Sequence, residues 1–162
     1  MGPSSPSPRL SRDHVVVCLD DEVPVLSALR RLLRYEPYQL RTTTDPGEAL
    51  RWVQESEISL VISDHRMPAM TGIDLLRKVR QLSSDTVRVI LTGYPDDGLV
   101  VRGMEDRAVE WLIAKPWNDA ELRTTVRRLL FEHELRWNPC LAPEDPSTSI
   151  LPPRRPSPPP TS

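Results

Sequence analysis

Residues 58–72 read ISLVISDHRMPAMTG, and this stretch decides how the rest of the chain is interpreted. Its first five residues are apolar apart from Ser59, which predicts a short buried strand. Asp64 stands at the carboxyl end of that strand. Open parallel sheets place their ligand sites beyond the carboxyl ends of their strands, so an acid here is a candidate for chemistry. A turn-forming or capping aspartate is the plain alternative, and the other strand ends decide between them.

The rest of the chain alternates between two kinds of apolar pattern. Apolar or β-branched runs predict strands at 14–19, 38–43, 87–91 and 109–114. Helical spacing predicts helices at 24–37, 45–56, 73–82, 95–107 and 118–137. Five strand–helix units imply an α/β fold with one parallel sheet, right-handed crossovers and helices on both faces. We expect 38–43 at an edge because of its polarity, and 95–107 as the most mobile helix because of Gly98 and Gly103.

Proline marks the expected domain boundaries. Twelve of the eighteen prolines lie before Arg9 or after Asn138 in a chain of 162 residues. We therefore expect disordered segments at 1–12 and 138–162 around a single domain at 13–137. The run PPRRPSPPP at 152–160 could form polyproline II and bind an aromatic groove on a partner, and an inert tail is the simpler alternative.

Composition excludes several classes of function. The net charge is −2 with acids and bases interspersed, which predicts neither nucleic-acid nor membrane binding. The N-terminus has no apolar core of a signal peptide, and no apolar run is long enough to span a membrane. Cys18 and Cys140 have neither metal-ligand nor disulfide-framework spacing, which favours a reducing cytoplasm.

The strand ends carry a set of polar residues that belong together. Parallel strands bring their carboxyl ends to one edge of the sheet, and the residues expected there are Asp20, Asp21, Asp64, Thr92 and Lys115. Three carboxylates in one place repel one another unless a cation lies among them. Mg²⁺ or Mn²⁺ suits such oxygen ligands and shares its remaining positions with phosphate. A lysine and a threonine suit phosphoryl oxygens, so the set describes a phosphoaspartate site.

These motifs resemble those of the receiver domains of two-component response regulators. The resemblance covers about 13–137 and rests on DDE at 20–22, S-D-x-x-M-P-x-M-x-G at 63–72, LTG at 91–93 and KPW at 115–117. It implies a flavodoxin-like, CheY-like (βα)5 fold with strand order 2-1-3-4-5. It also implies a phosphoacceptor signalling domain that assists its own phosphorylation and dephosphorylation, rather than an enzyme.

The resemblance assigns roles to individual residues. Asp64 would be the phosphoacceptor, and Thr92 and Lys115 would bind the phosphoryl group. The metal would be held by Asp21 and Asp64 directly, by Asp20 through a water and by the backbone carbonyl of Arg66. The donor would be a histidine kinase or a histidine phosphotransfer protein.

No output domain is recognisable after 137, so the expected signal leaves through protein contacts. One option is a homodimer through the face formed by 95–107, 109–114 and 118–137. The aromatic that many receivers carry three residues before the lysine is replaced by Leu112, and Trp111 lies one residue earlier on the opposite side of the strand. Trp111 is therefore either an interface anchor or a half-buried core residue.

Other histidines and other families give weaker interpretations. His65 could act as a base, but an exposed loop histidine is the simpler expectation, and His133 is expected on a helix surface.

A haloacid-dehalogenase-type phosphatase would need D-x-D after the first strand, and a nucleotide switch would need a P-loop. A flavin carrier would need a phosphate loop where this chain has acids. A receiver-like interaction module that works without phosphorylation remains the main alternative.

Overall fold

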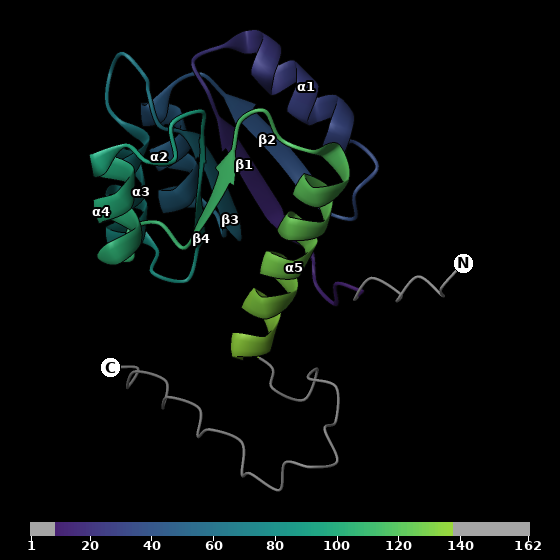
Figure 1. Ribbon diagram of the computed structural model, residues 1–162. Coiled ribbons are helices and arrows are strands. Elements are labelled where there is room, and N and C mark those ends of the chain that lie inside the picture. Colours follow the sequence, from purple (N-terminus) through teal and green to yellow (C-terminus); the bar gives the residue numbers. More distant parts are fainter. Residues whose placement is uncertain (1–8, 138–162) are drawn as a thin grey trace, which may run out of the picture.

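The computed structural model describes residues 9–137, which form one sheet covered by helices on both sides (Figure 1). Residues 1–8 of the predicted N-terminal tail at 1–12, and all of the predicted C-terminal tail at 138–162, lie outside the described residues. The five strands are parallel and lie in the order β2-β1-β3-β4-β5, as predicted. They are β1 (Val15–Leu19), β2 (Gln39–Thr43), β3 (Leu60–Asp64), β4 (Val87–Thr92) and β5 (Trp111–Ala114). The helices are α1 (Val23–Leu33), α2 (Pro46–Glu55), α3 (Gly72–Leu82), α4 (Gly98–Glu105) and α5 (Asp119–Trp137).

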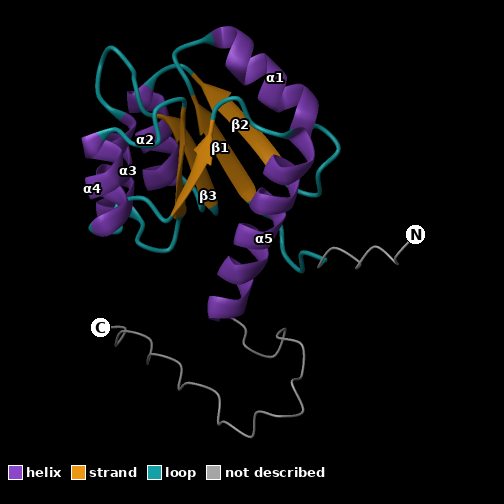
Figure 2. Cartoon of the chain, in the orientation of Figure 1, coloured by secondary structure: helices purple, strands orange, loops and turns teal. Residues whose placement is uncertain are grey.

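The helices cover the two faces of the sheet separately (Figure 2). One face packs against α1 and α5, through a core that includes Val16, Leu29, Leu60 and Leu130. The other face packs against α2, α3 and α4, and its core includes Leu76. Because strand side chains alternate between faces, neighbouring residues of β1 and β3 enter different cores. The sheet is therefore buried on both sides, as its continuous apolar strands predict.

Some boundaries differ from the predicted ones for local reasons. Helix α4 is shorter than the predicted 95–107, because Asp97 caps it by accepting a hydrogen bond from the Leu99 N–H at 2.9 Å. Arg107, just past its end, has a positive φ of 63°, which stops the helix. Side chains at the start of two other helices act as caps: Asp45 accepts the Gly47 N–H, and Asn118 accepts the Glu121 N–H.

Gly72 allows the chain to turn closely past the end of β3. A Cβ at this position would lie 2.1 Å from the backbone oxygen of Asp64. The Gly72 N–H donates to the carbonyl of His65 at 2.8 Å, which closes the loop between β3 and α3. The final glycine of the 63–72 motif therefore fixes where the backbone of Asp64 can lie.

The opposite end of the sheet holds a buried network that the sequence did not suggest. The ring of His14 lies 2.7 Å from Ser59 Oγ and 2.7 Å from Glu134 Oε1. The backbone N–H groups of Ser11 and Arg12 also donate to Glu134. This network attaches the segment before β1 to the last turns of α5.

His133 is only 6% exposed, so its expected place on a helix surface is wrong. It faces inward because α5 turns this side of its last turns toward the sheet, where the ring lies 5.9 Å from that of His14. No hydrogen-bond partner for its buried Nδ1 occurs among the described residues. Burial lowers the pKa of His133 below 6.5, and the neighbouring positive groups add to this effect.

A lowered pKa at His133 predicts a specific acid sensitivity. The stability that neutral His133 contributes is present above about pH 6.5 and is lost as the pH falls toward the folded-state pKa. We expect the free energy of unfolding of the wild type to fall more steeply from pH 7 to pH 5 than that of His133→Gln. The slopes can differ by up to about 1.4 kcal/mol per pH unit. Urea unfolding at each pH measures both, and parallel curves would contradict the assignment.

Candidate functional site

The predicted acidic residues do come together at the carboxyl edge of the sheet. Asp20 and Asp21 follow β1, and Asp64 ends β3, the strand beside it. Each contributes a carboxylate oxygen to a group in which all these oxygens lie within 4.8 Å of one another. Asp20 is 1% exposed and Asp64 is 9% exposed, whereas Asp21 faces solvent. Two almost buried carboxylates and an exposed one therefore share a single small site.

Lys115 completes this cluster from the loop after β5. Its Nζ donates to Asp20 Oδ2 at 3.0 Å and to Asp64 Oδ1 at 3.1 Å. Burial opposes the lysine charge, but these two hydrogen bonds prevail and raise the pKa of Lys115. Burial also raises the pKa of Asp64 above its ordinary value, and it is aided by Asp20 and Asp21 and opposed by Lys115. The cluster is thus short of positive charge.

Thr92 lies at the same edge, at the end of β4. Its neighbour Leu91 pairs with Asp64 in the sheet, and Thr92 itself pairs with Ala114, next to Lys115. The side chain is buried, and its Oγ1 accepts a hydrogen bond from the Tyr94 N–H at 3.0 Å. All the polar residues predicted at the strand ends therefore lie at the same edge of the sheet.

His65 and Arg66, which follow Asp64 in the chain, connect the acidic cluster to the start of α4. The Arg66 guanidinium lies 4.0 Å from the centre of the Tyr94 ring and 3.6 Å from Asp97. The ring of His65 is 3.7 Å from the same carboxylate. The hydrogen bond from the Leu99 N–H lowers the pKa of Asp97, and the nearby Arg66 guanidinium adds to this effect. Asp97 is also the cap of α4. The loop after Asp64 and the start of α4 are thus joined through Asp97.

His65 is 2% exposed, so the expectation of an exposed loop histidine is wrong. It is buried because the tight loop closed by Gly72 turns its ring toward Asp97 instead of solvent. The role of Asp97 was also missed. Its only sequence signal is an aspartate just before the first glycine of a predicted helix, which indicates a cap but not its long-range partners.

Trp111 and Leu112 lie on opposite sides of β5, as predicted. Leu112 packs against the core shared with α3 and α4. Trp111 is 38% exposed, and the Arg128 guanidinium of α5 lies 4.3 Å from its ring centre. Trp111 is thus half-buried, on the surface between β5 and α5.

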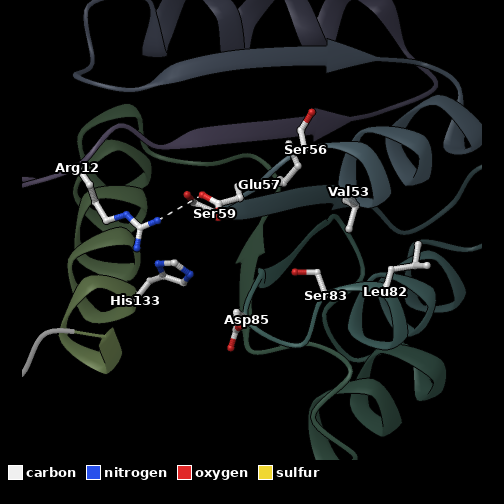
Figure 3. Close-up of a pocket in the computed structure, with 10 residues that line it drawn as sticks. Arg12, Val53, Ser56, Glu57, Ser59, Leu82, Ser83, Asp85 and His133 are labelled. Carbon is white, nitrogen blue, oxygen red and sulfur yellow. Dashed lines mark ion pairs between the residues drawn. The ribbon is translucent and has the colours of Figure 1, made fainter. Parts of the chain in front are cut away.

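A separate cavity lies at the other end of the sheet, at the amino ends of β1, β3 and β4 (Figure 3). It has a volume of about 360 Å³, and its lining includes Arg12, Glu57, Ser59, Asp85 and His133. Arg12 and Glu57 form an ion pair across its rim at 3.6 Å. None of the residues predicted for phosphoryl chemistry lines this cavity.

Fold and site together define a class of protein, and comparison with known proteins agrees. The family model described as "Response regulator receiver domain" matches residues 16–127. This chain therefore belongs to the response regulator receiver domain family, a module of two-component signalling rather than an enzyme of the ordinary kind. Among residues 9–137, no helix is both long and apolar enough to span a membrane.

Individual relatives support the same assignment. The chain is 33% identical over 117 residues to the hydrogenase transcriptional regulatory protein HoxA of Cupriavidus necator, covering 72% of this chain and 24% of that protein. It is 32% identical over 135 residues to the transcriptional regulatory protein HptR of Staphylococcus aureus, covering 80% of this chain and 52% of that one. The chain thus spans about a quarter to a half of the length of these curated relatives.

Solved structures give the same fold. The signal receiver domain of an HD domain-containing protein from Pseudomonas fluorescens is 31% identical, with a TM-score of 0.72, over 78% of this chain and 93% of that one. A CheY-like response regulator receiver domain protein from Methanospirillum hungatei is 24% identical, with a TM-score of 0.71, over 76% of this chain and 98% of that one. Because its identity is only 24%, the second structure supports the fold and nothing more.

The acidic triad is of the kind that binds Mg²⁺ in receiver domains. The residues fit such an ion: several hard oxygen donors converge, and Lys115 alone does not neutralise them. We expect Mg²⁺ at 100 times its Kd to stabilise the wild type by about 2.7 kcal/mol. The Asp21→Asn variant should bind Mg²⁺ about tenfold more weakly or worse. At the same Mg²⁺ concentration, its stabilisation by the ion should then be about 1.4 kcal/mol or less.

Thermal unfolding with and without Mg²⁺ measures both stabilities. Asp74→Asn is the matched control, since it removes an exposed carboxylate of α3 that lies outside the triad. It should retain the full stabilisation. Equal stabilisation of Asp21→Asn and the wild type would contradict a role for Asp21 as a ligand.

Proposed function

We propose that this chain is a phosphoacceptor response regulator that takes a phosphoryl group onto Asp64 from a histidine kinase or a phosphotransfer protein. Receiver domains act together with histidine kinases, which supports a phosphohistidine donor. The observation that carries the proposal is the contact of Lys115 with Asp20 and Asp64 inside the acidic triad. Packing does not require this arrangement, and phosphoryl transfer does.

The chemistry follows from the residues present. A carboxylate oxygen of Asp64 forms a bond to the phosphorus of a phosphohistidine, in line with the breaking bond to the imidazole nitrogen, which leaves with the bonding electron pair. Lys115 moves from the carboxylates to the phosphoryl oxygens, and the Thr92 hydroxyl donates a hydrogen bond to another phosphoryl oxygen. Mg²⁺ held by Asp21, Asp64, the Arg66 carbonyl and, through water, Asp20 would supply charge neutralisation at these oxygens.

Transfer of the phosphoryl group would change the contacts that lead to α4. Thr92 would turn toward the phosphoryl oxygens and lose the hydrogen bond that it accepts from Tyr94. The added negative charge would compete with Asp97 for the Arg66 guanidinium, now 3.6 Å from that cap. Since Leu112 replaces the family's aromatic, we infer that this chain uses the Arg66–Asp97 contact to bias α4.

The signal would leave through protein contact on the surface of α4, β5 and α5. Leu99, Val101, Met104 and Trp111 are large apolar side chains exposed on these elements. We propose that this surface, with Trp111 at its centre, binds a downstream protein or a second copy of the chain.

The test of the proposed function is phosphoryl uptake. The full chain is incubated with a small-molecule phosphodonor and Mg²⁺ and measured by intact-mass spectrometry. We expect one phosphoryl group per chain with Mg²⁺ and none with excess chelator. If no donor gives an adduct, including a phosphorylated histidine kinase, the proposal is wrong. The alternative, an interaction module that works without phosphorylation, is then the better account.

The bulk of Arg66, two residues after Asp64, and of Tyr94, two residues after Thr92, predicts a slow loss of the phosphoryl group. The Arg66 guanidinium lies 4.0 Å from the centre of the Tyr94 ring, and we propose that this stacked pair restricts the approach of water to a phosphoryl group on Asp64. We expect Arg66→Ala and Tyr94→Ala each to shorten the half-life of the phosphorylated chain, by about threefold to tenfold if roughly 1 kcal/mol of barrier is lost. Tyr35→Ala, on an exposed ring far from the site, should not shorten it. Unchanged half-lives in both site variants would contradict this role.

A further inference from the structure

A groove lies along the outer edge of β5, beside the first turns of α5. Its volume is about 470 Å³, and two tryptophans, Trp111 and Trp117, line it together with Pro116 and Glu121. β5 pairs only with β4 in the described sheet, so the backbone groups on its outer side have no strand partner there. The groove therefore offers aromatic surfaces and free backbone donors side by side.

Its features match one kind of ligand, a proline-rich segment in the polyproline II conformation. Such segments bind between aromatic side chains and lose little entropy because they are already extended. Proline carbonyls accept hydrogen bonds, and the free edge of β5 has N–H groups to donate. Glu121 lines the groove, is exposed and takes part in none of the ion pairs found among the described residues, so it can receive a basic residue of the ligand.

The chain itself carries a proline-rich sequence that could serve as this ligand. Residues 152–160 read PPRRPSPPP, with two arginines and no acid. We infer that this segment docks into the β5–α5 groove of its own chain, with Arg154 or Arg155 beside Glu121. The inference does not depend on phosphorylation of Asp64.

The length of the chain allows this contact. The groove lies at the start of α5 and the tail begins at its end, so the tail must return along a helix of 19 residues, about 28 Å. The 14 residues at 138–151 span about 43 Å when extended, which is enough. An intramolecular ligand also has an effective concentration of about 1 mM, so even a weak contact is substantially occupied.

A docked tail would cover Trp111, which lies on the surface proposed to bind partners. Partner binding and tail docking would then compete.

The indole N–H signals of the ¹⁵N-labelled full chain test this inference. The wild type is compared with a variant in which all prolines of 152–160 are changed to serine. We expect the signals of Trp111 and Trp117 to differ between the two chains, the signal of Trp52 on α2 to be the same, and none to change on tenfold dilution. Superimposable spectra would overturn the inference, and so would differences that disappear on dilution, which would indicate a second copy.

A peptide added in trans provides the second measurement. A synthetic peptide of residues 150–162, titrated into the serine variant, should move the Trp111 and Trp117 signals toward their wild-type positions. Glu121→Gln should weaken this binding about twofold to fivefold, as for an exposed ion pair. Glu55→Gln, an exposed glutamate on α2, should leave it unchanged. Movement of Trp52 instead, or no movement at all, would overturn the docking site.

Discussion

Asp64→Asn is expected to abolish phosphoryl uptake completely. The amide that replaces the carboxylate has nearly the same shape but no anionic oxygen to attack phosphorus. The wild type should gain one phosphoryl group per chain in the presence of Mg²⁺ and a small-molecule donor, and the variant none, by intact mass. Asp74→Asn removes an exposed carboxylate of α3 instead and should be phosphorylated like the wild type.

The fold of Asp64→Asn serves as its internal control. The substitution removes one of three mutually repelling carboxylates and one hydrogen bond to Lys115. We therefore expect the metal-free variant to lose no more stability than that single hydrogen bond contributes. Near-normal thermal unfolding together with absent uptake would assign the loss to chemistry. Uptake by this variant at the wild-type rate would show that another residue accepts the phosphoryl group.

Lys115→Met should have the second largest effect. It removes the charge that contacts Asp20 and Asp64 at 3.0 and 3.1 Å while keeping most of the side-chain length. A hydrogen bond to a charged group contributes about 1.5–3 kcal/mol, so phosphoryl uptake should slow by roughly tenfold to a hundredfold. The metal-free variant should also unfold more easily, because two almost buried carboxylates lose their counter-charge.

The chain offers a matched control for this variant, because it contains only one other lysine. Lys78 is exposed on α3, and Lys78→Met should leave both uptake rate and stability close to wild type. Mg²⁺ should restore much of the stability lost in Lys115→Met, since a dication can neutralise the same carboxylates. Equal uptake rates for the two lysine variants would contradict a role for Lys115 at the phosphoryl group.

Much of this site was predictable because each element carried its own signal. Apolar runs ending in acids placed Asp20, Asp21 and Asp64 at strand ends, and parallel topology then required those ends to meet. The strand order came from the resemblance to receivers and was confirmed. Asn118 was readable as a cap because capping is a contact between neighbours in sequence.

Long-range pairs were not predictable in the same way. Nothing near Arg66 in the sequence indicates that its guanidinium meets Asp97, which lies beyond another strand. The burial of His65 depends on a loop closure, and that of His133 depends on how α5 is rotated against the sheet. The groove between Trp111 and Trp117 also arises only when β5 takes the edge position.

The central claim is that Asp64 accepts phosphorus, and the most direct measurement locates the adduct in the chain. Borohydride reduces an acyl phosphate on an aspartate to the alcohol, which marks the modified position permanently for peptide mass spectrometry. After incubation with Mg²⁺ and donor, we predict homoserine at position 64 and unreduced aspartate at positions 20 and 21. Homoserine at another position, or a phosphorylated chain in which position 64 remains aspartate, would contradict the account.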